Sequence, residues 1–143
     1  MKKILLILLT TFCLSILYSC DTTIDKIIQQ GLNQANAELP LMMEEGIICD
    51  NITLGENGIV YHYTVDEDLY DMDILKSMVG ELKQETIQNY KEDMYDDNET
   101  KEFLQAAADL NKPLNHKYEG NITGTIVRYK ISVSELKSIL GKY

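Results

Sequence analysis

The chain has 143 residues, of which 45% are hydrophobic and 25% are charged, and its formal net charge is −10 at pH 7. This acidic balance argues against nucleic acid as a partner, because phosphates must be neutralised by Lys and Arg. The length suffices for one domain with one modest hydrophobic core.

The N-terminal segment has the layout of a secretory signal peptide. Lys2 and Lys3 give it a positive start, an apolar run follows over residues 4–17, and small or polar residues precede Cys20. A helix that crosses the hydrocarbon layer needs about 20 apolar residues, and this run is shorter and contains threonine and serine. The pattern predicts a signal peptide over residues 1–19, with a membrane-spanning helix as the less favoured alternative.

The end of that segment resembles the lipobox of bacterial lipoprotein precursors. Leu17 stands three residues before Cys20 and Ser19 stands directly before it, while Tyr18 is bulkier than the residue that the family usually carries. The resemblance implies that the Cys20 thiol receives a diacylglyceryl group and that the chain is cut before Cys20. Two or three acyl chains hold a protein firmly on a membrane, at about 0.8 kcal/mol per buried CH₂. An ordinary signal peptide with an incidental cysteine is the alternative.

Cleavage there defines the organisation of the mature chain. It leaves 124 residues with a formal charge of −12, of which 20–23 form a lipidated tether and 24–143 a single α+β domain. The resemblance implies an address in the cell envelope, anchored by lipid and expected at the outer membrane, on a side that the sequence leaves open. Because so acidic a body is repelled by an anionic membrane surface, the lipid itself must hold the protein there.

Cysteine usage provides no disulfide. Cys13 leaves with the signal peptide and Cys20 takes the lipid, so Cys49 is the only thiol of the mature domain. It lies in the aliphatic stretch GIICDNIT, which predicts a strand with the cysteine packed in the core.

Patterns for catalysis and metal binding are sparse. Only His62 and His116 ionise near neutral pH, and each lies in a predicted strand beside tyrosine. No G-x-S-x-G, H-E-x-x-H, C-x-x-C or phosphate-binding glycine loop occurs. The acidic runs at 66–73 and 92–99 lack the turn glycine of a calcium loop. We therefore expect no catalytic residue, no metal and no cofactor, with a small envelope enzyme or inhibitor, or an exported ligand or cation binder, as alternatives.

The mature chain opens with a predicted helix and a hairpin. Apolar residues recur at helical spacing from Ile24, and Leu39-Pro40 ends the helix because the residue before proline leaves the helical region. Strands near 46–54 and 58–66 then flank an Asn-Gly pair, the strongest short hairpin signal. In the second strand IVYHYTV alternates, which turns one face inward and leaves the other in solvent.

Helices and a second hairpin complete the pattern. A single apolar stripe over 75–90 predicts one helix, and another is expected near 99–110. A hairpin turning within 120–124 follows, and Ser132 with Glu135 forms a capping box for the last helix.

The two hairpin-and-helix units resemble each other. The triplet NIT occurs at Asn51 and Asn121, and a similar strand alternation starts at Ile59 and at Val127. The predicted fold is α+β: an N-terminal helix, then two β-hairpin plus helix units that form a four-stranded antiparallel sheet with helices on one face. Chance similarity of common strand patterns explains the likeness equally well.

That layout leaves one sheet face uncovered. The side chains expected on it are Val60, His62, Thr64, Ile126, Arg128 and Lys130. Such a mixture is typical of a protein-binding surface and equally of a solvated sheet face. We therefore expect a lipid-anchored cell-envelope protein that acts as a binding or assembly module without catalytic activity, with the membrane and a protein of unknown identity as partners.

The mature domain also resembles small exported α+β proteins of Gram-negative bacteria. An N-terminal helix, the junction Leu39-Pro40 and the strand motif with Tyr61 and Tyr63 carry this resemblance. Those proteins mostly have no assigned activity, so the resemblance implies a fold and an exported address and carries over no site residues.

Mass spectrometry of the N-terminal peptide tests the lipid anchor. Protein expressed in a bacterial host should yield a diacylglyceryl-modified peptide that begins at Cys20, and the variant Cys20→Ser should yield none because serine has no thiol to form the thioether. An unmodified peptide that begins elsewhere would contradict the anchor and indicate a soluble exported protein.

Overall fold

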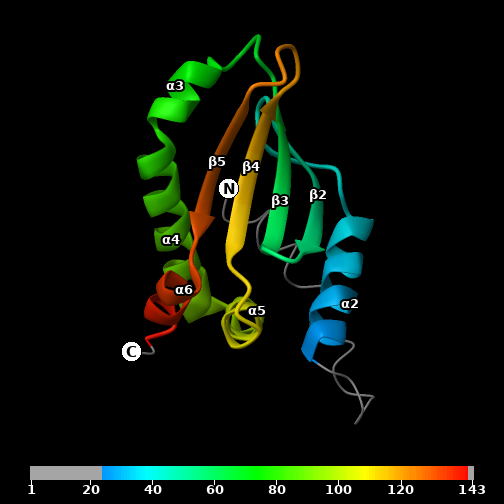
Figure 1. Ribbon diagram of the computed structural model, residues 1–143, viewed down its shortest axis with the longest axis vertical. Coiled ribbons are helices and arrows are strands. Elements are labelled where there is room, and N and C mark those ends of the chain that lie inside the picture. The colour runs from blue at the N-terminus through cyan, green and yellow to red at the C-terminus, as the bar shows by residue number, and fades with distance from the viewer. Residues whose placement is uncertain (1–23, 142–143) are drawn as a thin grey trace.

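A computed structural model of the chain describes residues 24–141 and shows an α+β fold built on a five-stranded sheet (Figure 1). The elements, in chain order, are α2 (Ile24–Ala37), β1 (Leu41–Glu44), β2 (Ile47–Gly55), β3 (Gly58–Val65), α3 (Met72–Ser77), α4 (Val79–Asp96), α5 (Asn98–Asp109), β4 (Leu114–Gly120), β5 (Ile126–Ile131) and α6 (Val133–Ile139). The predicted signal peptide, Cys20 and the tether lie outside the described residues.

The sheet has the order β1-β2-β3-β4-β5, and it is mixed. The predicted class, α+β, is right, but the prediction of four antiparallel strands is wrong in two respects. The strand β1 was not predicted, because four residues are too few to show a period. The strands β3 and β4 pair in parallel, because α3, α4 and α5 form a crossover that returns the chain to the end of the sheet where β3 began.

The hairpin predicted around Asn57-Gly58 is confirmed. Gly55 stands opposite Gly58, so only Glu56 and Asn57 connect β2 to β3. Gly58 has a φ of +122°, and its backbone lies directly against Pro113 at the start of β4. A side chain has no room at that position.

The predicted helix over 75–90 is two helices. α3 ends at Ser77 and α4 begins at Val79, with Met78 between them as the cap of both. Asp71 begins α3 by accepting hydrogen bonds from the backbone of Asp73 (2.8 Å) and Ile74 (3.3 Å). The break leaves Met78 39% exposed, although the stripe placed it inward.

The core lies between one face of the sheet and the helices. In Figure 1, α3 and α4 run along the β5 side of the sheet and α2 runs beside β2. The predicted burial of Cys49 is confirmed, and the apolar stripes of the helices face the core as expected; their buried residues include Ile28, Leu32, Ala35, Leu75, Tyr90, Phe103, Leu104, Ala107, Leu136 and Ile139.

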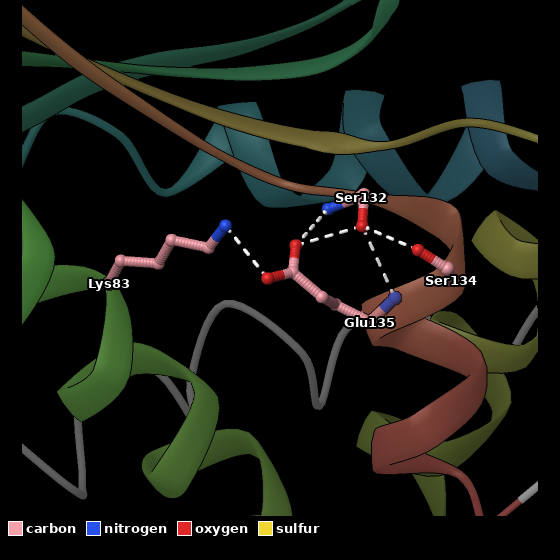
Figure 2. Close-up of polar contacts among 4 residues, drawn as sticks. All are labelled: Lys83, Ser132, Ser134 and Glu135. Atoms are coloured by element: carbon pink, nitrogen blue, oxygen red, sulfur yellow. Dashed lines mark hydrogen bonds and ion pairs between the residues drawn. The ribbon is translucent and has the colours of Figure 1, made fainter.

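The predicted capping box of the last helix is also confirmed (Figure 2). Glu135 accepts a hydrogen bond from the Ser132 backbone N–H (2.8 Å), and the Ser132 hydroxyl oxygen accepts one from the Glu135 backbone N–H (3.3 Å). The other carboxylate oxygen of Glu135 lies 2.8 Å from Lys83 Nζ. Burial raises the pKa of Glu135, but these bonds outweigh it and the net shift is downward. The cap thereby ties α6 to α4.

A side-chain amide covers part of an open sheet edge. The strand β1 pairs with β2 only as far as Cys49, and a bulge follows before Asn51. Beyond it, Asn36 of α2 accepts from the Ile52 N–H (2.7 Å) and donates to the Ile52 carbonyl (2.6 Å). Asn36 therefore satisfies edge groups that β1 is too short to reach, and it fixes α2 against β2.

Two glycine substitutions test the packing of the hairpin. Gly58→Ala should lower the free energy of unfolding by about 2 kcal/mol or more, because the new Cβ meets Pro113 and the φ is unfavourable for alanine. Gly80→Ala is the matched control: a Cβ there meets open space, so we expect a gain of about 0.5 kcal/mol. Equal urea midpoints for the two variants would contradict this account.

Candidate functional site

A cleft of about 370 Å³ lies between the sheet and α4. Its floor comes from the strands and includes Ile47, Tyr63, His116, Tyr118 and Tyr129. Its α4 wall is formed by Leu82, Glu85, Thr86, Asn89 and Asp93, while Met43, Glu44 and Leu75 complete the lining. We refer to this set of residues as the tyrosine cleft.

Stacked rings form the floor and continue beyond it to Tyr61, which does not line the cleft. Tyr61, His116 and Tyr129 stand side by side on β3, β4 and β5, and their ring centroids are 4.8 Å and 4.7 Å apart. Tyr63 and Tyr118 form a second stack at 4.5 Å. Neighbouring strands lie about 4.8 Å apart, so aromatic residues in register on one face are brought to stacking distance.

A chain of hydroxyl groups ties the floor to the α4 wall. The Thr86 hydroxyl donates to the Leu82 carbonyl (2.9 Å). Its oxygen lies 2.8 Å from the Tyr129 hydroxyl, and the latter lies 3.3 Å from the Tyr118 hydroxyl. Because a hydroxyl has one proton to donate, Tyr129 donates to Thr86 and Tyr118 donates to Tyr129. All three hydroxyl groups therefore donate toward α4, ending at the Leu82 carbonyl.

His116 is the most unusual residue of the floor. Its side chain is 3% exposed, and burial lowers its pKa to about 3, so the imidazole is neutral near pH 7. Its Nδ1 lies 3.1 Å from the Tyr63 hydroxyl. Its Nε2 is buried and makes no hydrogen bond within residues 24–141. A buried polar atom without a partner costs about 1–3 kcal/mol.

Burial also stabilises the neutral forms of other ionisable groups around the floor. It raises the pKa values of Tyr63 and Tyr118, with neighbouring tyrosines contributing. Burial, together with the charge of Asp50, raises the pKa of the Cys49 thiol to about 12. The thiol is fully buried and does not line the cleft. The floor is therefore uncharged near pH 7.

The six residues predicted for the uncovered sheet face do share one face, on the side away from the tyrosine cleft. His62 stands beside Lys117, which stands beside Arg128, and the others occupy the two neighbouring rows. Val60, His62 and Thr64 are half-buried, while Ile126, Arg128 and Lys130 are exposed. His62 Nε2 lies 3.0 Å from the Thr53 hydroxyl. Partner binding by this face stays a prediction.

Sequence reasoning missed the tyrosine cleft. The motif Tyr61-x-Tyr63 indicates strand alternation and carries the resemblance to exported proteins, but by itself it does not indicate a cleft; a matching His116-x-Tyr118 follows in β4. A further signal was available in α4, where polar side chains recur at every fourth position in a helix expected to pack on the sheet. Parallel pairing of β3 with β4 was needed to put the two motifs together.

The groups with catalytic or ligating potential are dispersed. His62 and His116 lie on opposite faces of the sheet, and Cys49 is fully buried. Within residues 24–141, no three His, Cys, Asp or Glu side chains converge as a metal site would require. In the same range, no helix combines the length and apolar character needed to cross a membrane.

Comparisons with solved structures identify two similar folds. A Pseudomonas aeruginosa protein described as secreted aligns with a TM-score of 0.61 and 10% identity, covering 79% of this chain and 92% of the other. EpsS, the pilotin of the Vibrio vulnificus type 2 secretion system, aligns with a TM-score of 0.53 and 12% identity, covering 79% and 91%. No family model matches the chain, and no curated protein matches it.

These likenesses define the class of fold. At such identity they show the fold alone, an α+β architecture shared with a secreted protein and a secretion-system pilotin. This agrees with the resemblance to small exported α+β proteins that the N-terminal helix and the motifs at Leu39-Pro40 and Tyr61 suggested.

The buried histidine makes a pH dependence testable. In the unfolded chain His116 binds a proton below its ordinary pKa of 6.5, whereas the folded imidazole binds one only near pH 3. Stability is therefore fully present above 6.5 and is lost as the pH falls, by about 1.4 kcal/mol per pH unit. His116→Gln should remove this part of the slope when urea unfolding is followed across that range.

His62→Gln is the matched control for that measurement. His62 lies on the opposite face and is only partly buried, so its replacement should leave most of the slope in place. If wild type and His116→Gln lost stability equally on acidification, the description of His116 as a buried neutral group would be wrong.

Proposed function

We propose that this protein is a lipid-anchored cell-envelope protein that acts as a binding or assembly module and holds a segment of a protein partner in the tyrosine cleft. The observation that carries the proposal is the cleft itself. Its volume of about 370 Å³ lies in the range of cavities that accept ligands, about 300–1,000 Å³. Its tyrosine floor is the surface that interfaces favour.

A protein segment fits the cleft better than a flat partner does. The cleft is recessed between the strands of the floor and α4, so a partner reaches the floor with protruding side chains. The half-buried Tyr118 offers an aromatic surface that an aliphatic side chain can cover. The likeness to a pilotin of a secretion system supports a role in assembly.

Lipidation of Cys20 would keep the cleft close to the membrane. Only residues 21–23 separate that cysteine from the first residue of α2. An extended chain of that length spans roughly 10 Å, so the domain would work at the surface of the membrane, expected to be the outer membrane.

The proposal contains no catalytic step. A general base must exchange its proton near the working pH, and the pKa of His116, about 3, is far below neutrality. The cleft contains no thiol, since Cys49 does not line it. These facts support a module that binds and does not transform its partner.

Filling the cleft tests the proposal. Random peptides displayed on phage would be selected against the mature wild-type lipoprotein in detergent, and their affinities measured for two variants. Asn89→Trp places an indole in the cleft and should weaken the selected peptides at least about tenfold, or ~1.4 kcal/mol. Gln88→Trp adds the same indole on the exposed side of α4 and should change little.

Thermal unfolding of both variants would verify that they fold. Peptides that bind wild type and both variants equally would overturn the cleft as the site, and Arg128→Glu would then test the opposite sheet face. Failure to select any peptide would overturn the proposal as a whole.

A further inference from the structure

A polar stripe on α4 points to the chemistry of the partner segment. Glu85, Asn89 and Asp93 are spaced four residues apart, so they lie on one side of the helix, and all three line the tyrosine cleft. A helix packed on a sheet ordinarily turns an apolar stripe toward it. Here the apolar contact is made by neighbouring positions such as Leu82 and the fully buried Tyr90, and the cleft receives carboxylates.

The opposite wall is acidic as well. Glu44 of β1 lines the cleft, and its carboxylate accepts a hydrogen bond from the Tyr70 hydroxyl at 3.4 Å. Among the described residues that line the cleft, none is Lys or Arg. The cleft therefore has carboxylates on both sides of an uncharged aromatic floor, and its field favours a cation.

The tyrosine floor suits the same kind of group. The face of an aromatic ring attracts a cation within about 6 Å, and the methylene stem of Lys or Arg packs on apolar surface while its charged end stays with polar groups. Tyr118 and Tyr129 belong both to the floor and to the lining of the cleft. A basic side chain could thus contact floor and wall together.

His116 provides an independent indication of a ligand. It lines the cleft, its side chain is 3% exposed, and its Nε2 has no hydrogen-bond partner within residues 24–141. A neutral imidazole has one donor and one acceptor nitrogen. The contact with the Tyr63 hydroxyl engages Nδ1, so Nε2 is the nitrogen that lacks a partner, and a polar group of the bound segment can supply one.

We infer that the partner segment is basic and amphipathic: a Lys or Arg side chain, flanked by aliphatic residues, enters the tyrosine cleft between Glu85 of α4 and Glu44 of β1, whose carboxylates attract it. The inference rests on the proposed function, since it specifies the occupant of the same cleft. Attraction of this kind adds selectivity against acidic segments, which the two walls repel.

The test uses the phage-selected peptides that bind in the cleft, identified by their loss of affinity for Asn89→Trp. These peptides should be enriched in Lys and Arg relative to the starting library. Replacing their basic residues by Gln should weaken binding to wild type about tenfold, and raised ionic strength should reduce that difference. The double variant Glu44→Gln/Glu85→Gln should bind both forms of the peptide with similar affinity.

A charge-matched control separates local recognition from net charge. Glu81→Gln/Asp96→Asn makes the same change of charge at exposed positions of α4 outside the cleft, so its preference for the basic peptide should match that of wild type. Thermal unfolding would show that each variant folds. Equal loss of preference in both double variants would overturn the inference.

The remaining outcomes distinguish the two proposals. Cleft-binding peptides without basic residues, or with no dependence on them, would overturn the inference and leave the proposed function standing. If no selected peptide depended on the cleft, both would fall together.

Discussion

Parallel pairing of β3 with β4 is the constraint on which the rest of the structure depends. It places Tyr61 beside His116 and Tyr63 beside Tyr118, so that two aromatic motifs far apart in the chain become one floor. The same topology requires the crossover through α3, α4 and α5, which lays helices over that floor. Floor and wall of the tyrosine cleft are thus two results of one strand pairing.

The cleft persists because its polar groups restrain one another. Hydroxyl bonds from Tyr118 to Tyr129 to Thr86 connect the sheet to α4 at a fixed separation, and Lys83 connects α4 to the cap of α6 through Glu135. A purely apolar interface would close until its voids were filled, whereas hydrogen bonds hold the two surfaces at the distance that satisfies them. The exposed Glu85 then lies beside an aromatic surface.

The two faces of the sheet differ in chemistry. One carries stacked rings under helices and meets acidic side chains, and the other carries His62, Lys117 and Arg128 in a single row. The alternation of β3 and β5 predicted that His62 and Arg128 share a face, and Lys117 of β4 lies between them. Each face has a hollow: about 580 Å³ beside His62 and Lys117, and about 370 Å³ at the tyrosine cleft. A partner held in the cleft would leave this second face exposed.

The sequence by itself determined the α+β class, the Asn57-Gly58 hairpin, the capping box at Ser132 and the burial of Cys49, because each depends on residues close together in the chain. It did not determine the strand β1, the break at Met78 or the parallel pair. Only the tertiary structure decided these, since a four-residue strand has no readable period and strand direction depends on how a long crossover packs. The tyrosine cleft belongs to this second group, because its residues come from seven elements that meet only in the folded domain.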